Sequence, residues 1–178
     1  MTPERFINAF EENKLFVQSY YMTPSRWDQT VGSIPEVQDE SKWESPIKYL
    51  NDNNDAISDE VCALPNDIGG IYIFFIQGPT LPFLERYIAY IGRAQTTDSQ
   101  SIRKRAKEYY AESRSADGRP KIINLFKHWE QYLYFIYFPC SDNDVIVRCE
   151  SNLIRSILPP FNDDIADKII FSNPQNAF

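Results

Sequence analysis

Long hydrophobic runs are missing from this chain. Its longest apolar stretches, IYIFFI and YLYFIYF, have six and seven residues, whereas a helix that spans a bilayer needs about 20. The first residues, MTPERFINAFEENK, contain no apolar core of signal-peptide length, and their acidic residues are unusual in a transit peptide. We therefore expect a cytoplasmic protein with no membrane association.

Cysteine and histidine are scarce. The chain has three cysteines, Cys62, Cys140 and Cys149, without a CxxC pair, and one histidine, His128. These counts argue against a disulfide framework and against a zinc site. We expect the cysteines to be buried free thiols and His128 to be structural.

Positive charge is also in short supply, since the formal net charge is −7. The charges are unevenly distributed. Residues 1–69 contain 5 Lys and Arg against 13 Asp and Glu, whereas residues 86–127 contain 10 against 4. A basic segment in an acidic chain is compatible with local binding of a phosphate backbone. The alternative is an ordinary solvated helix face.

The chain is rich in short aromatic and β-branched segments. Residues 71–76 and 87–91 form two such runs, and Gly78, Pro79 and Pro82 punctuate the segment between them. This pattern predicts two antiparallel strands joined by a loop. The later elements that we expect are helices over 101–113, 121–131 and 142–158, and a strand over 132–140. Their order indicates an α+β domain with a small mixed or antiparallel sheet.

Three segments are expected along the chain. Residues 1–64 are an acidic extension, mostly helical or irregular, with a short helix that begins at Thr2. We expect this extension to pack on the main domain, to contact a protein partner, or to mediate self-association. Residues 65–165 are the main domain. Residues 166–178 are a tail with a short edge segment over 168–171.

Glu150 has an unusual position in the last predicted helix. At about 100° per residue it falls in the middle of the apolar arc set by Ile146, Leu153 and Ile157. A carboxylate that faces the protein needs a partner, because burying it unpaired is costly. The partner is either an arginine in an ion pair or a hard divalent ion such as Mg²⁺.

Arg105 and Tyr109 are one helical turn apart on the same face of the helix over 101–113. An arginine there can present a planar set of donors to a phosphate. The alternative is an arginine that covers the sheet edge beside a core tyrosine. Arg103 and Lys104 lie on other faces, where they meet solvent or a distal phosphate.

Several of these features occur in a fixed order. GIY stands at 70–72 and YIG at 90–92, and Arg93 follows at once. The segment IRKRAKEYY, then Glu150, and finally Asn162 after a Pro pair complete the series. Over residues 65–165 this set resembles the GIY-YIG endonuclease family. The resemblance implies a small three-stranded antiparallel sheet flanked by helices.

The resemblance also implies a site made of tyrosines, an arginine and a glutamate. The matching positions are Tyr72, Tyr90, Arg105, Tyr109, Glu150 and Asn162. The first tyrosine is expected to activate the attacking water, the arginine to contact the scissile phosphate, and the glutamate to bind the metal. The second tyrosine shapes the site, the third follows the arginine by one turn, and the asparagine supports the site. Further substrate contacts are expected from Arg93, Arg103, Lys104 and Lys107.

Two positions compete for the phosphate contact, because the loops here are longer than in compact members of the family. Arg105 is preferred over Arg103, since a tyrosine follows Arg105 one turn later. A tyrosine with a pKa of about 10 is a poor base. Tyr72 would therefore need a nearby cation, which Arg93 or the metal could supply.

The implied function is a DNA endonuclease that depends on one divalent ion, Mg²⁺ or Mn²⁺. Two alternatives stay open. One is a catalytically inert or partner-dependent module that binds nucleic acid or protein on the same fold. The other is a nuclease that acts on RNA.

Overall fold

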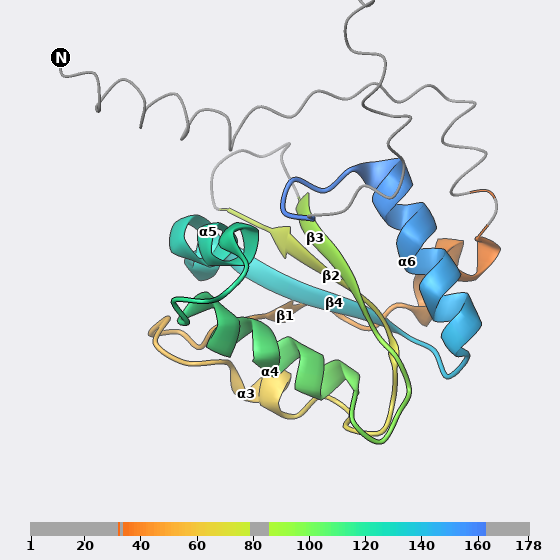
Figure 1. Ribbon diagram of the computed structural model, residues 1–178, viewed down its shortest axis with the longest axis horizontal. Coiled ribbons are helices and arrows are strands. Elements are labelled where there is room, and N and C mark those ends of the chain that lie inside the picture. Colours follow the sequence, from red (N-terminus) through yellow and green to blue (C-terminus); the bar gives the residue numbers. More distant parts are fainter. Residues whose placement is uncertain (1–31, 33, 79–85, 163–178) are drawn as a thin grey trace, which may run out of the picture.

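The computed structural model describes residue 32, residues 34–78 and residues 86–162 (Figure 1). Its strands are β1 (Ile47–Lys48), β2 (Gly70–Ile76), β3 (Tyr87–Ala94) and β4 (Leu133–Pro139). Its α-helices are α3 (Asp59–Cys62), α4 (Ile102–Ser113), α5 (Pro120–Trp129) and α6 (Asn143–Ile157). Its 3₁₀ turns are η1 (Pro35–Gln38), η2 (Glu40–Lys42) and η3 (Glu130–Tyr132).

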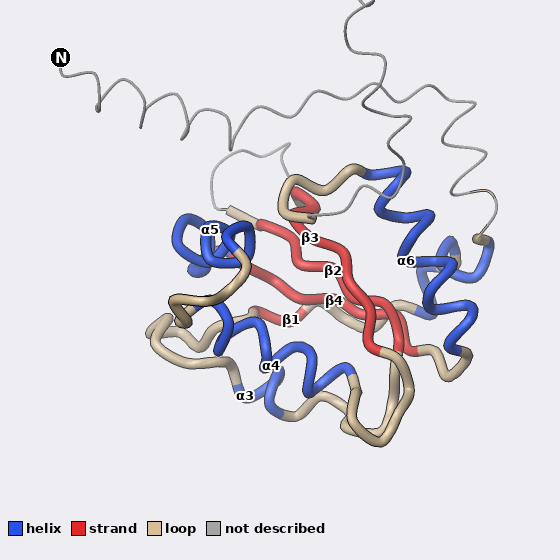
Figure 2. The backbone as a smooth tube through the Cα atoms, in the orientation of Figure 1, coloured by secondary structure: helices blue, strands red, loops and turns tan. Residues whose placement is uncertain are grey.

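The strands form one antiparallel sheet in the order β1-β4-β2-β3 (Figure 2). The α+β class is therefore confirmed, but the expected number of three strands is wrong. The additional strand, β1, comes from the segment that we assigned to the extension, and it pairs Ile47 with Phe135 and Lys48 with Tyr134. A two-residue strand is too short to show the alternation from which strands are predicted.

The two motif segments pair with each other across the β2–β3 hairpin. Tyr72 lies opposite Gly92, and Phe74 lies opposite Tyr90. A Cβ on Gly92 would come within 2.5–2.7 Å of the Tyr72 ring and hydroxyl. The glycine of YIG therefore makes room for the tyrosine of GIY. Gly70 has a φ of 151°, and a Cβ there would lie 2.1 Å from the carbonyl oxygen of Phe138, so this position also requires glycine.

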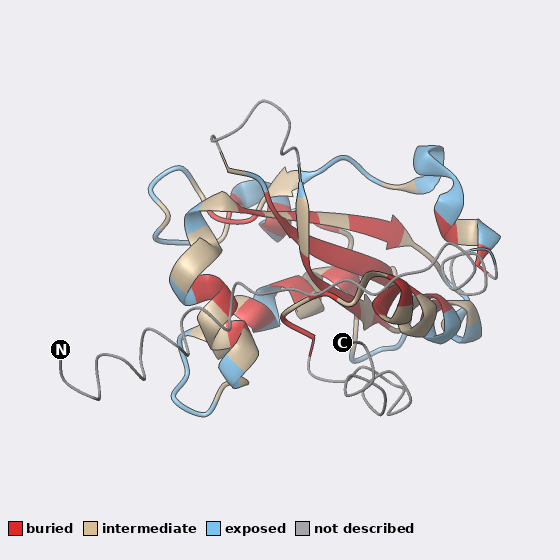
Figure 3. Cartoon of the chain, turned by 90° about the horizontal axis from the view of Figure 1, so that it is seen from above, coloured by how far each residue is buried: buried red, intermediate tan, exposed pale blue. Residues whose placement is uncertain are grey.

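Helices cover both faces of the sheet (Figure 1). On one face, α4 and α5 pack against the β-strand side chains that include Tyr72, Phe74 and Phe135. On the other face, α6 and the segment around η1 pack against Ile71 and Phe75, among others. The buried residues accordingly concentrate in the strands and along the inner sides of the helices (Figure 3).

Helices α4 and α6 begin where capping side chains satisfy free N–H groups of the first turn. The Ser101 side chain accepts a hydrogen bond from the Lys104 N–H at the start of α4, and that of Asp142 accepts from Asp144 and Val145 at the start of α6. Such caps are typical of helix N-termini. The α6 helix ends at Ile157, and Leu158, which follows it directly before the Pro pair, has a φ of 51°.

The three cysteines are free thiols, as expected. Only Cys149 is buried; Cys140 is half-buried and Cys62 is exposed. The expected burial is thus wrong for Cys62, because that residue ends the short helix α3 on its outer side. The expected helix at Thr2 and the expected edge segment over 168–171 lie outside the described residues.

No helix in the described part of the chain combines the length and the apolar character that crossing a membrane requires.

Candidate active site

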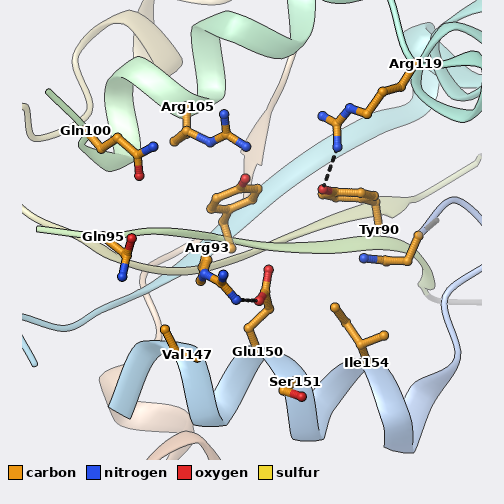
Figure 4. Close-up of a pocket in the computed structure, with 12 residues that line it drawn as sticks. Tyr90, Arg93, Gln95, Gln100, Arg105, Arg119, Val147, Glu150, Ser151 and Ile154 are labelled. Atoms are coloured by element: carbon orange, nitrogen blue, oxygen red, sulfur yellow. Dashed lines mark hydrogen bonds and ion pairs between the residues drawn. The ribbon is translucent and has the colours of Figure 1, made fainter. Parts of the chain in front are cut away.

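A cleft with a volume of about 490 Å³ crosses the edge of the sheet at β3. Side chains from the α4–α5 side line one of its walls, and side chains from α6 line the other (Figure 4). The expected site residues among its lining are Tyr72, Tyr90, Arg93, Arg105, Glu150 and Asn162. Residues that are up to 90 positions apart in the chain therefore meet in one cavity.

Three tyrosine hydroxyls form a hydrogen-bonded chain at the base of this cleft. The Tyr109 hydroxyl donates to Tyr90 at 3.0 Å and lies 2.7 Å from the Tyr72 hydroxyl. A phenol has one proton, so Tyr72 must be the donor in its bond to Tyr109. Tyr109 does not line the cleft itself; it is almost fully buried behind the other two.

Burial raises the pKa of all three phenols above the ordinary value of 10. At Tyr72 the neighbouring Tyr90 raises the pKa further, and the positive charge of Arg105 acts against both effects. The cation that acts on Tyr72 is therefore Arg105. Arg93, one of the two cations that we expected in this role, is paired with Glu150 instead.

Arg93 forms an ion pair with Glu150. Arg93 belongs to β3 and Glu150 to α6, and Figure 4 shows their charged groups meeting in the cleft. Only 15% of the Glu150 side chain is exposed, so it faces the protein as its helical position predicted. Burial raises the pKa of Glu150, and the charge of Arg93 partly offsets this rise. Of the two partners that the sequence left open, the arginine is present.

Glu150 is the one carboxylate among the cleft-lining residues that the structure describes. Among the described residues, no three His, Cys, Asp or Glu side chains gather into a group that could enclose a metal ion. Mg²⁺ is commonly bound through one or two carboxylates, with waters and substrate phosphate oxygens completing its shell. A single carboxylate in an open cleft fits that type of binding.

Arg105 projects from α4 into the cleft and is held by its own helix. Its Nη1 donates to Glu108 at 2.5 Å, and its guanidinium carbon lies 5.6 Å from the centre of the Tyr109 ring. Burial acts to lower the pKa of Arg105, but Tyr72 and Tyr109 outweigh it and raise that pKa. Arg105 therefore stays charged at any pH at which the protein is folded.

The other basic residues of α4 point elsewhere. Arg103 donates through Nε to the carbonyl oxygen of Leu64, and Lys104 donates through Nζ to that of Asp98 at 2.9 Å. Lys107 is exposed. None of the three belongs to the cleft lining in the part of the chain that the structure describes. Of the two arginines that competed for the phosphate contact, Arg105 is the one in the cleft.

Asn162 holds the free edge of β3. Its Oδ1 accepts from the N–H of Ile91 at 3.0 Å, and its Nδ2 donates to the carbonyl oxygen of Ile91 at 2.7 Å. The preceding residue adds a backbone bond from the Phe161 N–H to the Ala89 carbonyl at 3.1 Å. The side-chain amide of Asn162 thereby satisfies both the N–H and the carbonyl of Ile91, the middle residue of YIG.

Arg119 lines the cleft, but the sequence did not point to it. It stands between a glycine and a proline, in the segment Gly118-Arg119-Pro120, which indicates only the break between two helices. Its Nη1 lies 3.4 Å from the Tyr90 hydroxyl (Figure 4). The available signal was the arginine directly before a helix that begins with proline, which is too common to indicate a site.

Comparison of the chain with protein-family models, with curated proteins and with solved structures gave no match.

Proposed function

We propose that this protein is a divalent-metal-dependent endonuclease of the GIY-YIG type that hydrolyses phosphodiester bonds in DNA. The observation that carries the proposal is the single cleft into which five separate segments send Tyr72, Tyr90, Arg105, Glu150 and Asn162. The motif resemblance concerns order along the chain alone. The meeting of these side chains in space is a second and independent argument.

Arg105 and Glu150 have complementary roles in this proposal. Arg105 is permanently charged and fixed by Glu108, so it can bind a phosphate without first being ordered. Glu150 would hold the divalent ion, with waters and phosphate oxygens as the remaining ligands. The bound ion supplies positive charge that stabilises the phosphoryl oxygens in the transition state.

In this proposal Tyr72 accepts a proton from the attacking water. The Tyr72 hydroxyl donates its hydrogen bond to Tyr109 and accepts one from Arg105, so one lone pair of its oxygen is left for the water. Its raised pKa means that it acts as a neutral phenol. As the proton of the water enters, the Tyr72 proton moves to Tyr109, the Tyr109 proton moves to Tyr90, and the Tyr90 proton leaves to a phosphate oxygen or a water in the cleft, so that each phenol keeps one proton.

A cleavage assay tests the function directly. Supercoiled plasmid, branched DNA and single-stranded DNA are incubated with Mg²⁺, with Mn²⁺ and with chelator. We expect metal-dependent nicking that Glu150→Gln and Arg105→Gln each reduce by about 10²–10³-fold, the usual effect of removing one group that stabilises the transition state. Arg114→Gln is the matched control, because Arg114 also pairs with a glutamate but lies outside the cleft lining.

Equal activity of the folded Glu150→Gln protein and the wild type would overturn the assignment of the site. Absence of cleavage on every DNA and RNA substrate with both metals would overturn the nuclease proposal. Cleavage of RNA but not of DNA of the same sequence would change the substrate class.

The second candidate is a binding module without turnover. The ion pair between Arg93 and Glu150 favours it, because a protein cation already occupies the position next to the carboxylate. Such a module would bind DNA with the same affinity in the presence and absence of Mg²⁺. The proposed nuclease would bind Mg²⁺ through Glu150, and the Glu150→Gln variant would not.

A further inference from the structure

Arg119 is a cleft residue that the proposed mechanism does not use. Glu112 of α4 holds it at three points: its Nε and backbone N–H donate to Oε1 at 2.6 and 2.9 Å, and its Nη2 donates to Oε2 at 2.9 Å. The remaining nitrogen, Nη1, is directed to Tyr90. A guanidinium held by a carboxylate through two hydrogen bonds along one edge, here Nε and Nη2, has a fixed direction. Arg119 is thus pre-oriented toward the cleft.

Arg105 and Arg119 lie against the same aromatic ring. Their guanidinium carbons are 5.6 and 5.4 Å from the centre of the Tyr109 ring. Figure 4 shows both groups extending from the same wall of the cleft, while Arg93 and Glu150 lie at the other wall. A glutamate of α4 anchors each of them, Glu108 for Arg105 and Glu112 for Arg119. The wall therefore presents two separate, fixed guanidinium groups.

The described residues that line the cleft carry a net positive charge. In the part of the chain that the structure describes, three arginines and one glutamate line it, and the glutamate is already paired with Arg93. The two glutamates that anchor Arg105 and Arg119 are not part of the lining. A cavity of about 490 Å³ is of a size that holds small organic ligands, so it has room for a nucleotide that carries more than one phosphate.

We propose that Arg119 and the Tyr90 hydroxyl form a second phosphate subsite, beside the one at Arg105, so that the cleft holds two neighbouring phosphates of one nucleic-acid strand. The inference rests on the proposed function, since it divides the substrate between two subsites of the same cleft. Arg119 Nη1 donates one N–H to the Tyr90 oxygen, and its second N–H and the Tyr90 hydroxyl proton are left for one phosphate oxygen. The proton of Tyr90 is available because its hydroxyl oxygen is the acceptor, not the donor, in the hydrogen bond with Tyr109.

The test compares a ligand with two phosphates and a ligand with one. Binding of deoxythymidine 3′,5′-bisphosphate and of deoxythymidine 5′-monophosphate to the full chain is measured by calorimetry without metal. We expect the wild type to bind the bisphosphate about tenfold more tightly, which is the size of one charged hydrogen-bonded contact. In Arg119→Gln this preference falls below about twofold, and in Arg119→Lys it is intermediate, because a lysine keeps the charge without the planar set of donors.

Arg114→Gln is again the matched control. Arg114 pairs with Glu130 and lies 5.1 Å from the centre of the Tyr110 ring, so the substitution removes the same kinds of contact at a place outside the cleft lining. It should leave the tenfold preference unchanged. Thermal unfolding of each variant shows whether it is folded.

Equal affinity of the wild type for the two ligands would overturn the second subsite, whatever the variants do. An unchanged preference in folded Arg119→Gln would also overturn it. These results are separate from those of the cleavage assay. A protein that prefers the bisphosphate but cleaves nothing keeps the two-phosphate site and loses the nuclease, whereas a nuclease without the preference keeps only the subsite at Arg105.

Discussion

Tyr72 can line the cleft although it is fully buried in the folded chain, because the residue opposite it has no side chain. The Cα of Gly92 lies under the ring, where a Cβ would meet the Tyr72 hydroxyl oxygen at 2.5 Å. The letters GIY and YIG thus describe one packing arrangement, in which a glycine on one strand admits a tyrosine from the other.

Gly92→Ala should therefore lower the free energy of unfolding by about 1–3 kcal/mol, the usual cost of overpacking a core. Denaturant unfolding gives this value. In a Tyr72→Leu background the same substitution should cost clearly less, because the hydroxyl and the outer ring carbons that the new methyl group meets are gone. An equal loss in both backgrounds would mean that the strain comes from the backbone of β3.

The buried phenols make the protein sensitive to alkaline pH. Burial raises the pKa of Tyr49, Tyr72, Tyr90 and Tyr109 in the folded state, whereas in the unfolded chain a tyrosine has a pKa of about 10. Above that pH the unfolded state binds fewer protons than the folded state, so the free energy of unfolding falls. The stability that these phenols contribute is complete below about pH 10 and is lost as the pH rises toward the folded-state pKa values.

Unfolding in denaturant, measured between about pH 8 and pH 11, checks this expectation. Each of the four phenols should contribute up to about 1.4 kcal/mol per pH unit to the decline above pH 10. Tyr109→Phe, which removes one ionising group, should show a shallower decline. A free energy of unfolding that stays constant to pH 11 would show that these hydroxyls ionise in the folded state as they do in water.

The direction of a single side chain could be predicted where it depends on one local rule. The helical period alone directed Glu150 toward the protein, because side chains repeat every 3.6 residues. The same period could not identify Arg93 as an ion-pair partner of Glu150. Arg93 is 57 positions away and reaches α6 only because β3 runs past it.

At the scale of elements, the edge strand β3 depends on the segment that follows α6. Asn162 satisfies the N–H and the carbonyl of Ile91, and both of these bonds are buried. Without it, this edge of the sheet would present unpaired backbone groups beside the cleft. The asparagine therefore positions the strand that carries Tyr90 and Arg93.

Asn162→Ala should lower the free energy of unfolding by about 1–3 kcal/mol, because it leaves buried backbone groups of Ile91 without partners. Native-state hydrogen exchange should show a loss of protection at the Ile91 amide that exceeds the loss at Ile73, a residue of the neighbouring strand β2. Asn162→Asp should lose only the bond to the Ile91 carbonyl, because a carboxylate cannot donate but can still accept from the Ile91 N–H, so the Ile91 amide should keep more protection than in Asn162→Ala. Unchanged exchange at Ile91 would mean that other groups hold the edge.

The long elements were predictable from the sequence, and the shortest strand was not. Helices α4 and α6 have capping residues at their starts and an apolar face at helical spacing, and β2 is an uninterrupted apolar run. Strand β1 has two residues and exists because β4 offers it a free edge. Its formation is decided by a partner strand more than 80 positions further along the chain.

At the scale of the whole molecule, an acidic chain carries a cleft that is lined by arginines. The net charge is −7, so most of the protein should repel a phosphate backbone. In the proposed function, the substrate is held by the arginines of the cleft, which can contact few phosphates at once. This would limit how strongly the affinity for DNA depends on salt.

We expect the logarithm of the DNA association constant to fall with the logarithm of salt concentration with a slope between about −2 and −3, as for two or three neutralised phosphates. Arg119→Gln should make the slope shallower by about 1. Fluorescence anisotropy with a labelled oligonucleotide, measured with Glu150→Gln to prevent cleavage, gives both values. A slope steeper than about −5 would require a larger contact surface than the cleft.

The sequence by itself determined the α+β class, the long helices and strands, and the residue types of the site, because periodicity, caps and the GIY and YIG segments are local. The tertiary structure decided which of these residues meet. It paired Glu150 with Arg93, turned Arg105 into the cleft and Arg103 away from it, added β1 to the sheet, and brought Arg119 to Tyr90. Contacts of this kind depend on how strands and helices pack, and packing joins residues that are far apart along the chain.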